Sequence, residues 1–229
     1  MPLDIDFLRQ VDLFKNLEEG ELEQIRSIIA VRSFPKHSLL FLENSEGDGL
    51  YLIKSGAVKI FRATEEGREK ILAIFRRGDF FGEMSLLDGG LRSASAETME
   101  KSVVMVLRRS EFIRLLERFP ALSMKIIHAL CRRLRRANEQ IEMIAFWDVR
   151  SRVLKILLDL AYEHGTGLDR GRRIDLRLTH QELASLAAAS RETVTRVLQE
   201  LQDQGLIHMD GRNIVVLPPA ESYLGAGYL

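Results

Sequence analysis

The sequence contains a single cysteine, Cys131, among its 229 residues. One cysteine excludes an internal disulfide framework, a cysteine-held iron–sulfur cluster and a structural zinc site of the multi-cysteine kind. The sequence also lacks an apolar run of about 18 residues, so we expect no membrane-spanning segment. Its first residues, 1–6, show no basic region followed by an apolar run, so we expect no secretory signal and a cytoplasmic location.

An excess of charge of either sign is lacking as well. Lys+Arg and Asp+Glu each number 33, which gives a formal net charge of +0. This balance excludes a uniformly basic coat for nucleic acid but leaves room for a local basic face. With 46% hydrophobic and 29% charged residues, the composition is that of a globular chain. Its length suffices for two domains.

The sequence pattern changes from helical to β near residue 31. Residues 5–30 have the spacing of an amphipathic helical region. Short apolar runs separated by glycine-containing turns follow, about ten residues apart, and they predict a small barrel or sandwich. The expected strands are 38–42, 50–53, 57–61, 71–75 and 103–107, with a short helix over 110–119.

A long helix is expected over residues 122–146. At about 1.5 Å per residue it would run nearly 40 Å, too long for one small domain to cover. The apolar residues of this helix follow each other at steps of four and three residues, which is the spacing of a two-helix seam and predicts a dimer interface. The alternative is a helix packed within the core of one chain. The seam residues are Ile127, Cys131, Leu134, Asn138, Ile141 and Ala145.

A second helix is expected from Val149, with Asp148 as its N-cap. The segment 163–173 that follows it contains three glycines and several charges. We expect this segment to be an exposed, mobile loop.

The strongest chemical signal lies in residues 80–94. Gly82 stands beside a short helical turn, whose backbone N–H groups suit an anion. Glu83 can accept hydrogen bonds from two neighbouring hydroxyls, as a ribose offers. Arg92 can return across a turn and supply a fixed charge to a phosphate, and Ser93 adds a donor. The alternative is a simple ion pair between Glu83 and Arg92 in a protein without a ligand.

A second signal lies in residues 179–216. Thr179 and Glu182 form a capping box, and Ser190 is the N-cap of the next helix. That helix leaves polar residues outward near its N-terminus, which is the end that a helix-turn-helix inserts into the major groove. Alternatively, two of these residues form only a surface pair four residues apart. The outward residues are Arg191, Glu192, Thr195 and Arg196.

Residues 205–216 predict a hairpin with an Asp210-Gly211 turn. This hairpin would be the wing of a winged helix, and it would place Arg212 near a phosphate.

The two motifs together resemble those of the cAMP receptor protein / fumarate-nitrate regulator superfamily of transcription regulators. The segments FGEMSLL and RSA are similar to the phosphate-binding cassette of cyclic-nucleotide-binding domains, with the likeness covering residues 20–145. The segment SRETVTRVLQELQDQGLI resembles the family's DNA-binding domain over about forty residues. The resemblance implies ligand contacts from Gly82, Glu83, Met84, Ser85, Arg92 and Ser93, and from Arg133 and Asn138 on the long helix.

For DNA, the resemblance implies that Arg191, Glu192 and Arg196 read bases in palindromic, TGTGA-like half-sites of double-stranded DNA. Thr179, Ser190, Thr195 and Arg212 complete the predicted DNA interface. The segment 163–173 corresponds to a surface that contacts RNA polymerase in the family.

Three departures from the family pattern matter. Ala137 and Asn138 stand where a Thr-Ser pair faces the purine, so cAMP, cGMP and a cyclic dinucleotide stay open, with cAMP favoured. Asn138 either faces the purine or sets the register of the seam. Thr195 replaces a glycine and adds a contact, and Ala188 replaces the turn glycine, so the turn holds without positive φ or with mild strain.

The expected protein is therefore an α+β homodimeric regulator, not an enzyme and not membrane-bound. It would have a β-roll sensor domain (1–120), a long dimerisation helix (121–147) and a winged helix-turn-helix domain (148–229). We expect a cyclic nucleotide effector, no metal, no iron–sulfur cluster and no haem, although His128 and Cys131 lie three residues apart. A ligand-independent regulator of the same family is the alternative.

Overall fold

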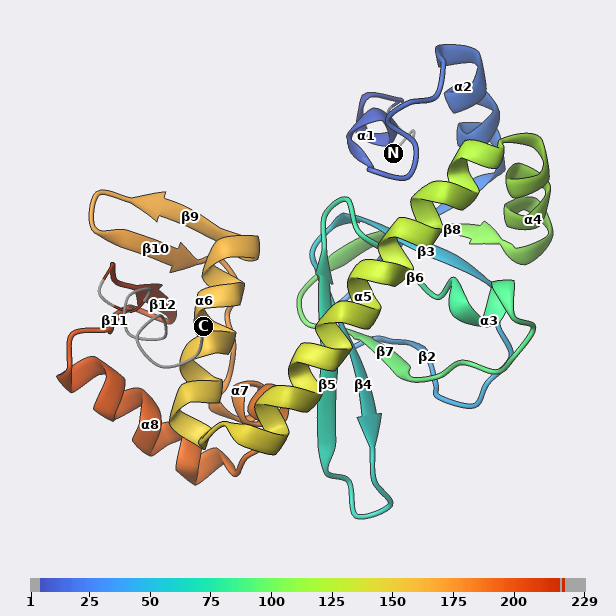
Figure 1. The fold of residues 1–229 in the computed structure, drawn as a ribbon. Helices are drawn as coiled ribbons and strands as arrows, with labels where there is room; N and C mark the ends of the chain where they lie inside the picture. The colour runs from blue at the N-terminus through green and yellow to red at the C-terminus, as the bar shows by residue number, and fades with distance from the viewer. Residues whose placement is uncertain (1–4, 219, 221–229) are drawn as a thin grey trace. The chain divides into compact units, whose positions relative to one another are not determined.

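The computed structural model describes residues 5–218 and 220, and the chain divides into two compact units, Met1–Arg135 and Arg136–Leu229. The division falls within one long helix, α5 (Pro120–Phe146) (Figure 1). Pro120 is the first residue of this helix, as suits a residue without a backbone N–H, and the helix before it ends at Arg118.

The first unit is a roll of two four-stranded antiparallel sheets. One sheet has the order β1-β8-β3-β6 and the other the order β2-β7-β4-β5. Their bounds are β1 (Ile29–Phe34), β8 (Ser102–Arg108), β3 (Gly49–Ser55), β6 (Phe80–Phe81), β2 (Leu39–Phe41), β7 (Ser95–Thr98), β4 (Ala57–Ala63) and β5 (Glu69–Arg76). The five expected strands are confirmed, whereas β1, β6 and β7 were not expected.

Side chains alternate between two cores along β3. Tyr51 and Ile53 pack in the interior of the roll, whereas Leu50 and Leu52 join the core formed with the helices. This alternation follows from the two-residue period of a strand. The helices of that second core are α1 (Ile5–Gln10), α2 (Glu19–Ile28), α3 (Met84–Leu87) through Leu86, α4 (Arg109–Arg118) and the start of α5.

The second unit consists of helices and a third antiparallel sheet of order β11-β12-β10-β9. Its further elements are α6 (Val149–His164), α7 (His180–Ala187), α8 (Arg191–Asp203), β9 (Gly165–Leu168), β10 (Gly171–Ile174), β11 (Ile207–Asp210) and β12 (Asn213–Val216). The wing hairpin is confirmed, with Gly211 and Arg212 as its two turn residues and Gly211 at φ 61°.

Residues 166–170 are exposed as predicted, but the prediction of a loop over 163–173 is wrong. Most of that segment forms the β9–β10 hairpin, and β10 pairs with the wing strand β12 through Arg172↔Val216 and Arg173↔Val215. Glycines and charges hide the strand pattern in the sequence, but the edge of β12 supplies hydrogen-bond partners.

Three predicted helix caps are confirmed. Asp148 accepts a hydrogen bond of 2.8 Å from the backbone of Ser151 at the start of α6. Thr179 and Glu182 form the capping box of α7, and Ser190 caps α8 through the N–H of Thr193. Each cap satisfies a backbone N–H that a helix end leaves without a partner.

Candidate functional site

The turn between β6 and α3 (Met84–Leu87) positions Gly82 and Glu83. Gly82 has φ 83°, and a Cβ there would lie 2.7 Å from Nη1 of Arg92. Only glycine therefore meets both demands, the left-handed backbone and the close approach of the guanidinium.

Arg92 is buried and anchored by its two terminal nitrogens. Nη1 donates to the carbonyl of Gly82 (2.6 Å) and to Oγ of Ser85 (3.0 Å). Nη2 donates to Oδ1 of Asp48 (2.8 Å) and to the carbonyl of Gly49 (2.8 Å). Nε of Arg92 is buried and has no hydrogen-bond partner among the described residues.

Aromatic rings cover the Arg92 guanidinium. Its central carbon lies 4.3 Å from the ring centre of Phe41 and 5.5 Å from that of Tyr51. Burial, together with the charge and the hydrogen bond of Asp48, raises the pKa of Tyr51 to about 12. These rings hold a cation in a site from which most water is excluded, where it attracts an anion more strongly than at the surface.

Glu83 is 2% exposed, and its two carboxylate oxygens differ. Oε1 accepts a hydrogen bond of 2.7 Å from Nη1 of Arg133 in α5. Oε2 is buried and has no partner in the described part of the chain. A buried carboxylate oxygen left without a donor costs free energy, so a ligand hydroxyl that reached it would be bound favourably.

Arg133 is held by three further groups. It donates to the carbonyl of Phe80 and lies over the rings of Phe75 (4.6 Å) and Phe80 (5.0 Å). The expected alternative, a direct ion pair between Glu83 and Arg92, is not formed among residues 5–218, because Glu83 pairs with Arg133 and Arg92 pairs with Asp48.

The structure therefore brings most of the predicted ligand residues together. Ser93 and Met84 are exposed and in contact through Oγ and Sδ at 3.8 Å. Asn138 is exposed on α5 and belongs to the second unit. The residues brought together are Gly82, Glu83, Ser85, Arg92 and Arg133.

Three residues around Arg92 were not predicted from the sequence, namely Asp48, Phe41 and Tyr51. They are distant from Arg92 along the chain, and the pairing of the strands brings them to it.

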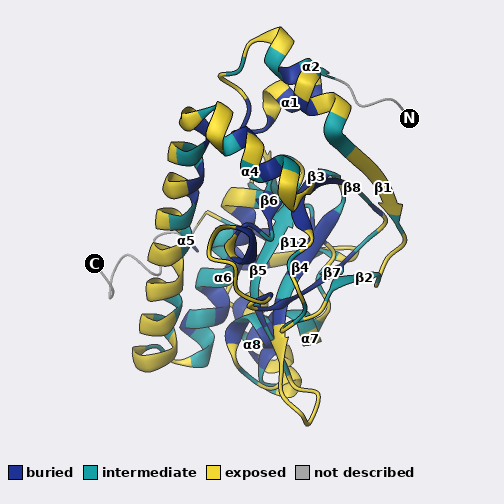
Figure 2. Cartoon of the chain, turned by 90° about the vertical axis from the view of Figure 1, so that its right-hand side faces the viewer, coloured by how far each residue is buried: buried dark blue, intermediate teal, exposed yellow. Residues whose placement is uncertain are grey.

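The seam residues of α5 are exposed in the single chain. Ile127 is 48%, Leu134 64% and Ile141 66% exposed, and Figure 2 shows most of the helix in the colour of exposed residues. The residues of α5 that are buried are Leu122, Ile126 and Ala129, all near its start.

Five of the predicted DNA residues lie on α8 and the turn of the wing. Arg191, Glu192, Thr195, Arg196 and Arg212 are all exposed. Arg191, Glu192 and Arg196 form no ion pair among the described residues, so the expected alternative of a Glu192–Arg196 surface pair is not formed there.

The predicted hydroxyls at the helix starts are engaged within the protein. Thr179 donates to Oε2 of Glu182 (2.8 Å), and Ser190 lies 2.9 Å from Oγ1 of Thr193. Ala188 adopts φ 50° and ψ 53° at the turn between α7 and α8, so this turn holds with left-handed strain, as one of the two expectations stated.

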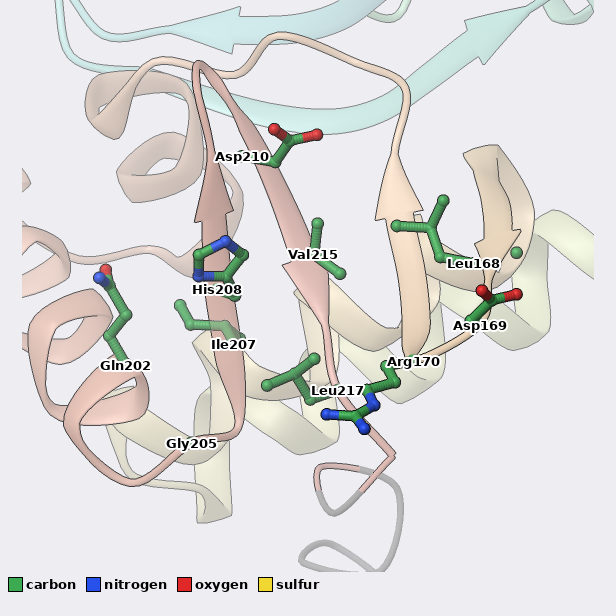
Figure 3. A pocket seen from close by; sticks show the side chains of 11 residues that line it. Leu168, Asp169, Arg170, Gln202, Gly205, Ile207, His208, Asp210, Val215 and Leu217 are labelled. Carbon is green, nitrogen blue, oxygen red and sulfur yellow. The ribbon is translucent and has the colours of Figure 1, made fainter.

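A pocket of about 950 Å³ lies in the second unit between the β9–β10 hairpin and the wing (Figure 3). Asp169, Arg170 and His208 are among its lining residues. It contains none of the residues predicted for the ligand or for DNA.

Two families match parts of the chain. Residues 31–119 match the cyclic nucleotide-binding domain, and residues 151–221 match the Crp-like helix-turn-helix domain.

Similar proteins cover nearly the whole chain. The CRP-like cAMP-activated global transcriptional regulator of Mycobacterium tuberculosis is 34% identical over 92% of this chain and 94% of its own. The cyclic AMP receptor protein of Thermus thermophilus is 37% identical over 86% and 88%. Among solved structures, the c-di-GMP-responsive global regulator CLP of Xanthomonas campestris superposes with a TM-score of 0.75 and 28% identity, over 87% of this chain and 99% of that one.

No helix in the part of the chain that the structure describes is long and apolar enough to span a membrane.

Proposed function

The chain belongs to the CRP/FNR family of transcription regulators, and we propose that it binds DNA as a dimer under the control of a cyclic nucleotide held in the roll. The fold class supports this proposal, since the chain joins a cyclic-nucleotide-binding roll, a long helix and a C-terminal helix-turn-helix.

One observation carries the ligand part of the proposal. The cluster around Gly82 contains a buried acceptor, Oε2 of Glu83, and a buried donor, Nε of Arg92, both without protein partners. Native proteins rarely leave such groups unpaired, so each points to a missing partner. A ribose hydroxyl would satisfy the acceptor, and a phosphate oxygen would satisfy the donor.

We favour cAMP as the nucleotide. The two relatives above with 34% and 37% identity are named for cAMP, whereas the solved structure with 28% identity is named for c-di-GMP. Arg133 stands beside the site, but the next turn of α5 carries Ala137 and Asn138 instead of a hydroxyl pair. A ligand-independent regulator remains the second candidate, and the titration below separates the two.

The exposed seam of α5 supports the proposed dimer. Apolar side chains at steps of four and three residues are left without a partner in one chain, and a second copy of the helix would cover them. Asn138 in this seam would set the register. Two α8 helices placed about 34 Å apart would then read a palindrome in successive major grooves.

The proposed control works through α5. A nucleotide hydroxyl at Oε2 of Glu83 would share this carboxylate with Arg133, a residue of the helix that we propose forms the dimer. We propose that this biases the register of the paired helices and the junction at Phe146–Asp148, and thereby the placement of α8. The change in DNA affinity that the nucleotide causes cannot exceed the ratio of its affinities for the two states.

The test combines two measurements on the full chain. Isothermal titration with cAMP, cGMP and c-di-GMP identifies the ligand, and fluorescence anisotropy with palindromic TGTGA-containing duplexes measures DNA binding with and without each nucleotide. We expect cAMP to bind and to raise DNA affinity. Specific DNA binding without any nucleotide binding would establish the ligand-independent regulator instead.

A further inference from the structure

Thr195 lies in the middle of the surface of α8 that the proposed function directs to DNA. At about 100° per residue, its Cα lies about 40° around the helix from Arg191 and about 60° from Glu192. Thr195 is exposed, as are both of these neighbours. A side chain at this position therefore faces the same groove as they do.

The hydroxyl of Thr195 already forms two hydrogen bonds within the protein. Oγ1 donates a hydrogen bond of 2.9 Å to the carbonyl of Arg191, one turn earlier. The same oxygen lies 2.8 Å from Nδ1 of His180. A hydroxyl has one hydrogen, and here the Arg191 carbonyl takes it, so Nδ1 of His180 must be the donor in the second bond.

Both partners of this hydroxyl are fixed in position. His180 is the first residue of α7, directly after the Thr179–Glu182 capping box. Arg191 is the first residue of α8, directly after the cap Ser190. The two bonds therefore link the starts of the two helices and hold Thr195 in one of the two χ1 rotamers that a threonine populates in a helix.

The remaining heavy group of the Thr195 side chain is its methyl. With Oγ1 turned to the backbone carbonyl, the side chain has no hydrogen left to donate to a base. In the major groove, the apolar feature that a threonine methyl contacts is the C5-methyl group of thymine.

We propose that Thr195 recognises a thymine methyl group in each half-site, and that His180 is the positioning residue that holds the Thr195 hydroxyl away from the bases. This inference rests on the proposed function, because it requires α8 in the major groove.

The experiment removes only the methyl group from the DNA. The preferred duplex is first selected from a random library by the full chain, with cAMP and in parallel without nucleotide. Each thymine is then replaced, symmetrically in both half-sites, by deoxyuridine. We expect one position at which deoxyuridine weakens binding about fourfold per half-site, the effect of one buried methyl group.

Variants of Thr195 assign this loss to the residue. Thr195→Ser keeps the hydroxyl and removes the methyl, so the preference for thymine over deoxyuridine should disappear. Thr195→Val keeps a methyl and should retain the preference. Glu192→Ala, the matched control on the same helix, should also retain it while discrimination weakens at a different base pair.

Variants of His180 test the positioning role. His180→Ala should reduce the preference, and His180→Asn, which keeps a donor, should restore it. When Thr195→Ser is already present, both His180 substitutions should leave the ratio of the affinities for the thymine and deoxyuridine duplexes at one.

The inference fails if the chain binds a specific duplex but no thymine position shows the effect, or if Thr195→Ser retains it. A failure of the proposed function looks different, because then no specific duplex is selected under either condition.

Discussion

Nη1 of Arg133, on the long helix α5, donates a hydrogen bond of 2.7 Å to Oε1 of Glu83, the buried carboxylate at the turn between β6 and α3. One oxygen of the proposed ligand-binding carboxylate is thus bound to the helix that carries the proposed dimer seam, and the other is without a partner among the described residues. A ligand at Glu83 would act on α5 through one side chain.

The first prediction concerns this pair. Arg133→Ala should lower the free energy of unfolding by about 1–3 kcal/mol, because it leaves a buried carboxylate without its charged donor. Urea unfolding measures the loss. The double variant Arg133→Ala with Glu83→Gln should recover part of it, because the unpaired charge is gone. A double variant no more stable than Arg133→Ala alone would show that the charge of Glu83 is not what costs stability.

The second prediction tests the proposed phosphate ligand. Arg92→Ala should abolish nucleotide-stimulated DNA binding and leave the dimer intact, since Arg92 lies in the roll and not on the seam. Anisotropy with and without cAMP measures the stimulation, and sedimentation measures the dimer. Arg109→Ala, an arginine at the start of α4, is the matched control and should leave stimulation normal. Normal stimulation of DNA binding in Arg92→Ala would show that Arg92 does not bind the nucleotide.

The third prediction tests the seam. Leu134→Glu should convert the dimer to monomers, because two carboxylates would face each other where two leucines are expected to pack. Sedimentation velocity over a range of concentrations measures the change. Arg132→Glu, two residues away and off the seam, is the control and should sediment like the unaltered chain. A dimer unaffected by Leu134→Glu would mean that another surface joins the copies.

The fourth prediction concerns the strained turn. Ala188 has φ 50°, which costs an L-residue about 1–2 kcal/mol, whereas glycine adopts this conformation readily. A glycine also gives the unfolded chain more conformational entropy, which offsets part of the relieved strain. Ala188→Gly should therefore raise the free energy of unfolding by about 0.5–1 kcal/mol. Ala189→Gly, at negative φ, should lower it by about 0.4–1 kcal/mol. Equal effects of the two substitutions in urea unfolding would show that strain at Ala188 is not the cause.

The fifth prediction tests base reading. Glu192→Ala should relax discrimination at one base position by about 1–3 kcal/mol, because an exposed carboxylate of α8 can accept from a cytosine amino group. Binding to a set of singly substituted duplexes measures the discrimination. Gln199→Ala, two turns further along α8, should leave the pattern unchanged. A uniform loss of affinity across all duplexes would place Glu192 outside the base-reading set.

The sequence alone determined the elements whose signals are local. The caps at Asp148, Thr179 and Ser190 and the heptad of α5 depend on residues within a few positions of each other, so their periodicity and polarity are visible in one dimension. The fold class followed from these elements together with the resemblance of two short motifs. Glu83 and Arg92 were identified as candidate ligand residues from the sequence because both lie within one short motif.

Only the tertiary structure decided which distant groups meet. Glu83 pairs with Arg133, fifty residues later, and Arg92 with Asp48, forty-four residues earlier. Strand β10 exists because β12 offers it an edge, and the hydroxyl of Thr195 is committed because His180 begins another helix beside it. A hydrogen bond depends on the distance between its atoms in space, and separation along the chain does not specify that distance until the strands and helices have packed.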